Sequence, residues 1–153
     1  MKKTLVLLIL CSALSAQAGE LQKAFESFTN NEKNYQKYLG EHPREIIATA
    51  KLQPNEEIMR DTAAFPNGLL LGENAYMEKI TDNKGCLVVM GTLKDSPDEI
   101  ADYSVEYLKQ GSDWIISDFK LRYYFEGRPR FLKEALCDPE EIADAWFSSL
   151  DED

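Results

Sequence analysis

The sequence predicts an α+β fold in which N-terminal helices pack on a curved antiparallel sheet of about four strands, followed by a C-terminal helix. Three observations lead to this expectation. Apolar residues recur at helical spacing before residue 53, whereas alternating patterns and glycine-containing turns dominate from residue 74 to residue 125. A helix-start pattern at Asp138 then predicts the closing helix.

The first eighteen residues have the parts of a secretory signal peptide. Two lysines precede an apolar run over residues 5–10, and Ala16-Gln17-Ala18 has the small-x-small pattern that signal peptidase cuts. We therefore expect cleavage after Ala18, a single α+β domain over residues 19–153, and a periplasmic or secreted location. The run is too short to span a bilayer, so no stable membrane anchor should remain after cleavage. An uncleaved anchor is the alternative.

The chain is acidic, with 17 Lys and Arg residues against 27 Asp and Glu residues and a formal net charge of −10. Loss of the two lysines in the signal peptide makes the mature protein more acidic still. Such a protein repels phosphate backbones and anionic lipid head groups. We therefore expect no nucleic-acid partner and no binding to membrane surfaces.

Cys86 and Cys137 remain after cleavage. An even pair in an oxidising compartment predicts a disulfide. The alternatives are a reactive thiol or a metal-binding pair. The two cysteines, however, lie far apart in the sequence, unlike the closely spaced pairs of redox and zinc motifs.

The N-terminal part predicts helices. Residues 20–39 have apolar side chains at helical spacing with polar residues between them, which predicts one amphipathic helix that Gly40 ends. Pro43 suits the first turn of a second helix over Arg44–Leu52, although the alternation there would also fit a strand. Residues 54–61 predict one or two further helical turns.

The sheet begins after a turn cluster at residues 65–68. A weakly alternating stretch over Asn74–Thr81 and the turn-prone residues 82–85 predict a hairpin. Its second strand, Cys86–Lys94, is apolar on both faces, which is typical of a central or covered strand.

Two further strands follow. Tyr103, Val105 and Tyr107 alternate with polar residues, and residues 110–112 predict a turn. Residues 114–125 predict the longest strand, with one apolar face at its odd positions interrupted only by Ser117. The residues expected on that face are Ile115, Phe119, Leu121, Tyr123 and Phe125. Asp138-Pro139-Glu140-Glu141 then predicts the start of a helix that runs to about residue 150.

The stretch from Tyr103 to Phe125 resembles the final hairpin of cone-shaped domains of the nuclear transport factor 2 type, which have the cystatin-like fold. The matching positions are Gly111 in the turn and the pattern Trp-x-Ile-x-x-Phe at Trp114, Ile116 and Phe119. The preceding helices and hairpin occur in the same order, whereas a helix after the last strand departs from the simplest pattern. Domains of this shape include enzymes, carriers and non-catalytic partners, so the resemblance implies no single activity and no catalytic residue.

Catalytic motifs are not found, and we expect no cofactor and no metal site. The single histidine, His42, precedes a proline in a predicted turn, where a surface or capping role is commoner than catalysis. Asp82-Asn83-Lys84-Gly85 has a lysine where a calcium ligand should be, which favours a turn. Asp118 is the best candidate for a catalytic carboxylate, because it interrupts the strand between Ile116 and Phe119, where an inward-facing acid could have a raised pKa. The alternative is a solvated aspartate paired with Lys or Arg.

A basic patch near the end of the last strand is the local exception to the acidic charge. The residues predicted to bind a partner there are Lys120, Arg122, Tyr124, Arg128 and Arg130. Arginine and aromatic residues are enriched in binding hot spots, and the patch would suit an anionic ligand or an acidic protein surface. Alternatively, these cations neutralise acidic helices of this protein.

The leading functional hypothesis is an exported, periplasmic, non-catalytic domain. It would bind a protein partner or a small molecule through the open end of its sheet or through the basic patch. The alternative is a small enzyme with a catalytic carboxylate in a cone-shaped pocket. A homodimer is a further alternative for the partner.

Overall fold

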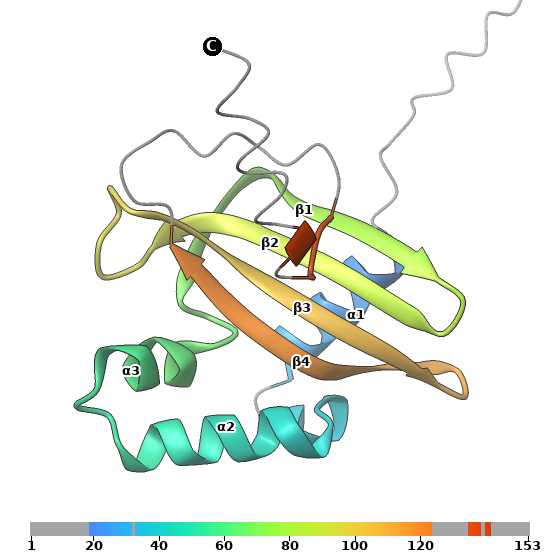
Figure 1. Ribbon diagram of the computed structural model, residues 1–153, viewed down its shortest axis with the longest axis horizontal. Coiled ribbons are helices and arrows are strands. Elements are labelled where there is room, and N and C mark those ends of the chain that lie inside the picture. The colour runs from blue at the N-terminus through green and yellow to red at the C-terminus, as the bar shows by residue number, and fades with distance from the viewer. Residues whose placement is uncertain (1–18, 32, 124–134, 139, 142–153) are drawn as a thin grey trace, which may run out of the picture.

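Four antiparallel strands form a single sheet, seen in a computed structural model that describes residues 19–31, 33–123, 135–138 and 140–141. The elements are α1 (Glu20–Thr29), the 3₁₀ helix η1 (Tyr35–Tyr38), α2 (Glu41–Leu52), α3 (Glu57–Ala64), β1 (Leu69–Thr81), β2 (Lys84–Leu93), β3 (Ile100–Gln110) and β4 (Asp113–Tyr123) (Figure 1). The strands lie in chain order, each antiparallel to the next. The predicted α+β class, with N-terminal helices on a four-stranded antiparallel sheet, is confirmed.

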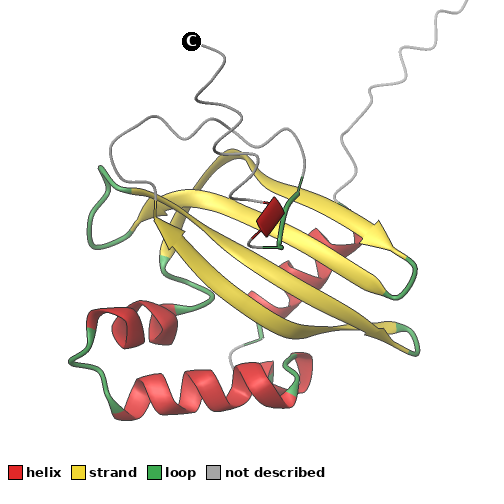
Figure 2. Cartoon of the chain, viewed as in Figure 1, coloured by secondary structure: helices red, strands yellow, loops and turns green. Residues whose placement is uncertain are grey.

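The helices cover one face of the sheet and its β4 side. Figure 2 shows α1 behind the sheet and α2 and α3 beside β4. Helix α1 packs on β1 and β2, whereas η1, α2 and α3 contact β4. Leu21, Phe25 and Phe28 are buried because their spacing of four and three residues places them on one side of α1. They meet the inward side chains of the central strands, among them Leu87, Val105 and Tyr107.

The prediction of one helix over residues 20–39 is wrong, because α1 ends at Thr29 and η1 begins at Tyr35. Asn30 follows the helix, a residue that competes for backbone hydrogen bonds and favours turns. The aromatic residues Tyr35 and Tyr38 still face the core, since both rings pack edge-on against Phe28. The apolar residues therefore pack on the same core although the helix that carries the first of them ends at Thr29.

The second helix is confirmed, and the strand alternative for residues 44–52 is excluded. Helix α2 begins at Glu41, with Pro43 in its first turn, where its missing N–H costs no hydrogen bond. Ile47 and Ala50 are buried, so the apolar residues of this stretch follow the helical period. The predicted helical turns at residues 54–61 correspond to α3, which begins and ends later.

The predicted inward face of the last strand is wrong at its start. The register of β3 and β4 shifts so that Glu106 pairs with Asp118 and Tyr107 pairs with Ile116. Ser117 is left between them as a bulge, and one extra residue switches the sides of the preceding positions. Trp114 and Ile116 are therefore buried, whereas Ile115 is not. The longest strand is β1, with 13 residues against 11 in β4; Phe125 lies outside the described residues.

A carboxylate from the sheet caps the first helix. Gly19, the residue before α1, has no side chain to accept hydrogen bonds from the first turn. Glu78 on β1 does so instead: its Oε2 accepts hydrogen bonds from the backbone N–H groups of Leu21, at 3.1 Å, and Gln22, at 3.0 Å. Its negative charge also lies at the positive end of the helix dipole.

Glu78→Ala should lower the free energy of unfolding by about 1 kcal/mol, because two N–H groups lose their acceptor. Urea denaturation monitored by circular dichroism measures the change. Glu78→Gln is the matched control, since it keeps an acceptor oxygen and loses only the charge, and it should cost less. Equal stability of the alanine variant and the wild type would contradict the cap.

A short segment, residues 135–138, covers the other face of the sheet, and we call it the strap. Cys137 in the strap forms the predicted disulfide with Cys86 on β2, with Cα atoms 5.8 Å apart. Ala135 packs with Val88 and Met90 in a small second core. The strap thus gives this face an apolar cover that the four helices do not supply.

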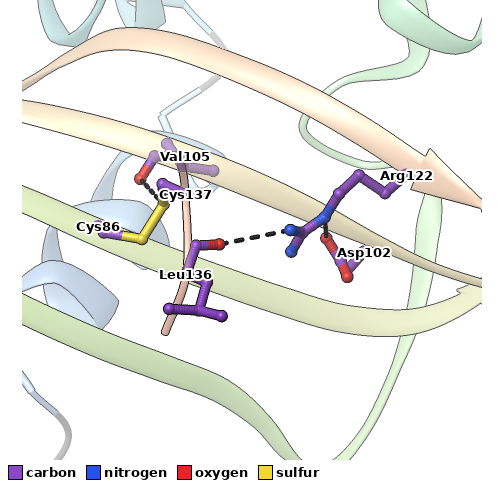
Figure 3. The surroundings of a disulfide bond; sticks show 6 residues. All are labelled: Cys86, Asp102, Val105, Arg122, Leu136 and Cys137. Atoms are coloured by element: carbon purple, nitrogen blue, oxygen red, sulfur yellow. Dashed lines mark hydrogen bonds and ion pairs between the residues drawn. A yellow bond between two sulfur atoms is a disulfide. The ribbon is translucent and has the colours of Figure 1, made fainter. Parts of the chain in front are cut away.

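The strap also lies over a buried ion pair (Figure 3). Asp102 on β3 is fully buried, and its Oδ1 accepts a hydrogen bond of 2.6 Å from Nε of Arg122 on β4. The Leu136 carbonyl oxygen accepts a hydrogen bond of 3.4 Å from Arg122 Nη1. Cys137 Sγ lies 3.7 Å from the Val105 carbonyl oxygen. The chain therefore crosses β2, β3 and β4 and joins all three.

The predicted C-terminal helix falls almost wholly outside the described residues and stays a prediction. The Asp138 carboxylate accepts a hydrogen bond of 2.8 Å from the Glu140 backbone N–H, as expected of a capping residue. Residues 142–150 of the predicted helix, and the predicted signal peptide, lie outside the described residues. Of the helices that the structure does describe, none has the length and apolarity needed to cross a membrane.

Candidate functional site

A cleft of about 340 Å³ opens at the end of the sheet where β2 leads into β3 and β4 ends. Helix α3 forms one wall, the β2–β3 loop another, and the ends of β3 and β4 form the floor. This is the left end of the sheet in Figure 1, beside α3. The charged and aromatic residues that line the cleft are Glu57, Arg60, Asp61, Lys94, Asp95, Glu99, Tyr103 and Tyr123.

Tyr103 lines this cleft and has a hydroxyl that is buried and unpaired. The residue is 1% exposed, and its hydroxyl has no hydrogen-bond partner among the described residues. It lies against the backbone of Gly68, where a Cβ would stand only 2.5 Å from the hydroxyl oxygen, so glycine leaves it room. A buried hydroxyl without a hydrogen-bond partner costs free energy. A ligand that supplied an acceptor would remove this cost.

The Tyr103 hydroxyl is a hydrogen-bond donor at physiological pH. Burial raises the pKa of Tyr103 to about 12, against the opposing effect of the Gly68 backbone, and the negative charge of Asp61 adds to the rise. The ring is held by Phe65, which packs edge-on against it with centroids 4.9 Å apart and stacks on Phe119. The position of the hydroxyl oxygen is therefore fixed before any ligand arrives.

Asp61 is partly buried, whereas the other acids that line the cleft are exposed. Its carboxylate is 17% exposed, accepts a hydrogen bond from the Tyr123 hydroxyl, and lies 3.5 Å from Arg60 Nε. Burial raises the pKa of Asp61; Arg60 opposes this rise, and the negative charges of Glu57 and Asp95 add to it. The cleft thus combines a carboxylate of raised proton affinity with two tyrosine hydroxyls, a set that can bind or exchange protons with a small polar molecule.

Asp118, the carboxylate singled out from the sequence, does not line this cleft. It lies next to the bulge of β4, where its Oδ1 accepts a hydrogen bond of 2.8 Å from the Phe119 N–H. The exposed His42 on α2 lies 3.8 Å from the same oxygen, measured from Nε2. This surface pair joins α2 to β4 and is separate from the Asp61 cleft.

The predicted basic patch is described only in part. Lys120 is exposed on β4, whereas Arg122 is 16% exposed and directed toward Asp102 beneath the strap (Figure 3). Tyr124, Arg128 and Arg130 lie outside the described residues. The charge of Arg122 is therefore matched inside the fold, and binding of a partner by the patch stays a prediction.

The sequence reasoning missed Asp61 and Tyr103 as site residues. Asp61 was only the end of a predicted helical turn, and Tyr103 only an apolar position of a strand. No motif links them, because they come from α3 and β3 and meet only after the helix folds back onto the sheet. The one available signal was a phenol on the inward face of a strand, since a buried tyrosine hydroxyl usually needs a partner.

Comparison with known proteins identifies no relative: no family model, curated protein or solved structure matches the chain. The described residues also contain no group of three His, Cys, Asp or Glu side chains that could hold a metal ion.

Proposed function

We propose that this protein is an exported, non-catalytic binding domain that holds a small molecule in the cleft at the open end of its sheet. The buried and unpaired hydroxyl of Tyr103, a residue that lines the cleft, is the observation that carries the proposal. A cleft of about 340 Å³ has the size of a site for a small molecule. Burial of most of such a ligand would let one or two hydrogen bonds determine its orientation.

Export is supported by two independent features. The first eighteen residues have the pattern of a signal peptide. The Cys86–Cys137 disulfide is consistent with an oxidising compartment, since such bonds are rare in the reducing cytosol. Together they support a periplasmic or secreted protein.

The order and packing of the elements support the resemblance to cone-shaped domains of the nuclear transport factor 2 type. Helices precede a four-stranded antiparallel sheet, and the cleft opens between that sheet and α3. Because this architecture serves many functions, the resemblance contributes the position of the site and leaves its ligand to be argued from the side chains.

Tyr103→Phe should weaken ligand binding about 2- to 12-fold, because it removes one hydrogen bond worth about 0.5–1.5 kcal/mol and keeps the ring. Native mass spectrometry of the disulfide-bonded protein, incubated with a defined mixture of polar metabolites, measures the bound fraction. Adducts on the wild type that decrease in the variant are the expected result.

Tyr107→Phe is the matched control. The Tyr107 hydroxyl is also buried without a hydrogen-bond partner among the described residues, but it does not line the cleft. Both variants therefore remove the same kind of group from the core, and only Tyr103→Phe should change binding. The proposal fails if the wild type binds no compound, or if both variants bind as it does.

The raised pKa of Asp61 favours a second function, a small enzyme that uses this carboxylate as an acid or base. The same incubation separates the two functions. An enzyme would convert a compound into one of different mass or retention time, whereas a binding domain returns it unchanged.

A further inference from the structure

The walls of the cleft carry more negative than positive charge. Four carboxylates line it, Glu57, Asp61, Asp95 and Glu99, whereas the lining cations are Arg60 and Lys94. The side chain of Arg60 is 60% exposed, so its charge lies near solvent, while the carboxylate of Asp61 is 17% exposed. Water screens an outer charge more strongly than an inner one. The other charged residues of the cleft are exposed like Arg60, so Asp61 carries the charge that water screens least, and the base of the cleft is negative.

The pKa values of Asp61 and Tyr103 are both raised, and nearby negative charges contribute to each rise. The pKa of Asp61 is raised by burial and further by Glu57 and Asp95. The pKa of Tyr103 is raised by burial and further by Asp61. An anionic ligand would add to the repulsion between the negative charges of the cleft, whereas a cationic ligand would offset it. The partly buried Tyr123 also lines the cleft, and the face of an aromatic ring attracts cations.

Asp61 still has acceptor capacity for a ligand. One oxygen lies near Arg60 and the other accepts the Tyr123 hydroxyl, but an ionised carboxylate can accept about four hydrogen bonds. The unpaired Tyr103 hydroxyl is a donor and needs an acceptor. A small molecule that fits the site would therefore have a cationic donor for Asp61 and a neutral acceptor for the Tyr103 hydroxyl.

We propose that the cleft selects a small organic ammonium ion whose positive charge lies beside Asp61 and whose oxygen acceptor faces the Tyr103 hydroxyl. This inference rests on the proposed function of the cleft as a small-molecule site and names the class of its ligand. The excess of carboxylates and the buried, unpaired Tyr103 hydroxyl support it independently.

Three probes with a common skeleton test the charge preference: 2-phenoxyethylamine, 2-phenoxyethanol and phenoxyacetate. They keep the aromatic body and the ether acceptor while the end group is cationic, neutral or anionic. Isothermal titration calorimetry at low salt should show the amine binding at least about tenfold more tightly than the alcohol, with the acid weakest. Equal or tighter binding of the alcohol or the acid would overturn the charge preference.

Asp61→Asn should remove most of this preference by weakening the amine about tenfold, with little change for the alcohol. Asp118→Asn is the matched control, because it removes a carboxylate outside the cleft and should leave all three affinities unchanged. Asp95→Asn, at an exposed position that tolerates substitution, should weaken the amine about two- to fivefold even if Asp61→Asn does not fold. Unchanged preference in both cleft variants would overturn the inference.

Failure of the amine to bind would also overturn the proposed ligand class. The incubation with a mixture of polar metabolites then tests separately whether the cleft binds any small molecule. Binding of a neutral or anionic compound that depends on Tyr103 would retain the proposed function and reject the ammonium ligand, whereas no binding at all would reject both.

Discussion

Arg122→Ala should lower the free energy of unfolding by about 3–5 kcal/mol, because it removes the guanidinium that donates to the buried Asp102 carboxylate. Asp102 is fully buried, and Arg122 Nε donates to it at 2.6 Å. Alanine would also remove the donor to the Leu136 carbonyl oxygen in the strap. A loss of this size is a large part of the stability of a typical domain.

Chemical denaturation of Arg122→Ala, Asp102→Leu and the double variant measures the pair as a cycle. The double variant should be destabilised by less than the sum of the two single losses, since neither charge is then left alone. Lys120→Ala is the control on the same strand, where an exposed lysine should contribute within about 0.5 kcal/mol. Additive single losses, or a loss at Arg122 no larger than that at Lys120, would show that the ion pair is not a stabilising unit.

Replacing both cysteines of the disulfide by serine should lower the free energy of unfolding by roughly 4 kcal/mol. The bridge closes a loop with a sequence separation of 51, and the chain-entropy model gives a value of that order for such a loop. The strap would lose its covalent link to β2, and Ala135 would be held against Val88 and Met90 by packing alone.

Urea denaturation of Cys86→Ser/Cys137→Ser against the oxidised wild type measures this loss. Wild-type protein treated with reductant should unfold at nearly the same urea concentration as the double variant, which separates loss of the bond from effects of the serines. Thiol labelling of the unfolded, unreduced protein provides the chemical check. A free thiol at Cys86 in protein isolated from its own compartment would disprove the bridge.

Local patterns were sufficient for most of the secondary structure. Proline at position 43 and the helical period around Ile47 indicated α2, and the turn residues 82–85 indicated the β1–β2 hairpin, which the structure contains. The two main errors arose where packing overrides local spacing. Tyr35 and Tyr38 have helical spacing relative to α1, but the helix ends before them. The bulge at Ser117 places Trp114 and Ile116 on the inward face of the sheet, where Ile115 was expected. Neither event leaves a pattern within a few residues.

The candidate site was harder to predict than the fold. From the sequence, Asp118 was the preferred carboxylate because it interrupts an apolar strand, yet the structure places it beside His42, away from the cleft. Asp61 had no distinguishing neighbours along the chain. Its proton affinity depends on burial, and burial is a property of three-dimensional packing.

The sequence by itself determined the class of fold and the pairing of Cys86 with Cys137, because periodicity, turn residues and cysteine count are local or additive properties. Only the tertiary structure decided that Arg122 faces Asp102 beneath the strap, and that Asp61 meets Tyr103 in one cleft. In both cases the two residues come from different elements. Their distance is set by strand register and helix packing, which no short-range pattern encodes.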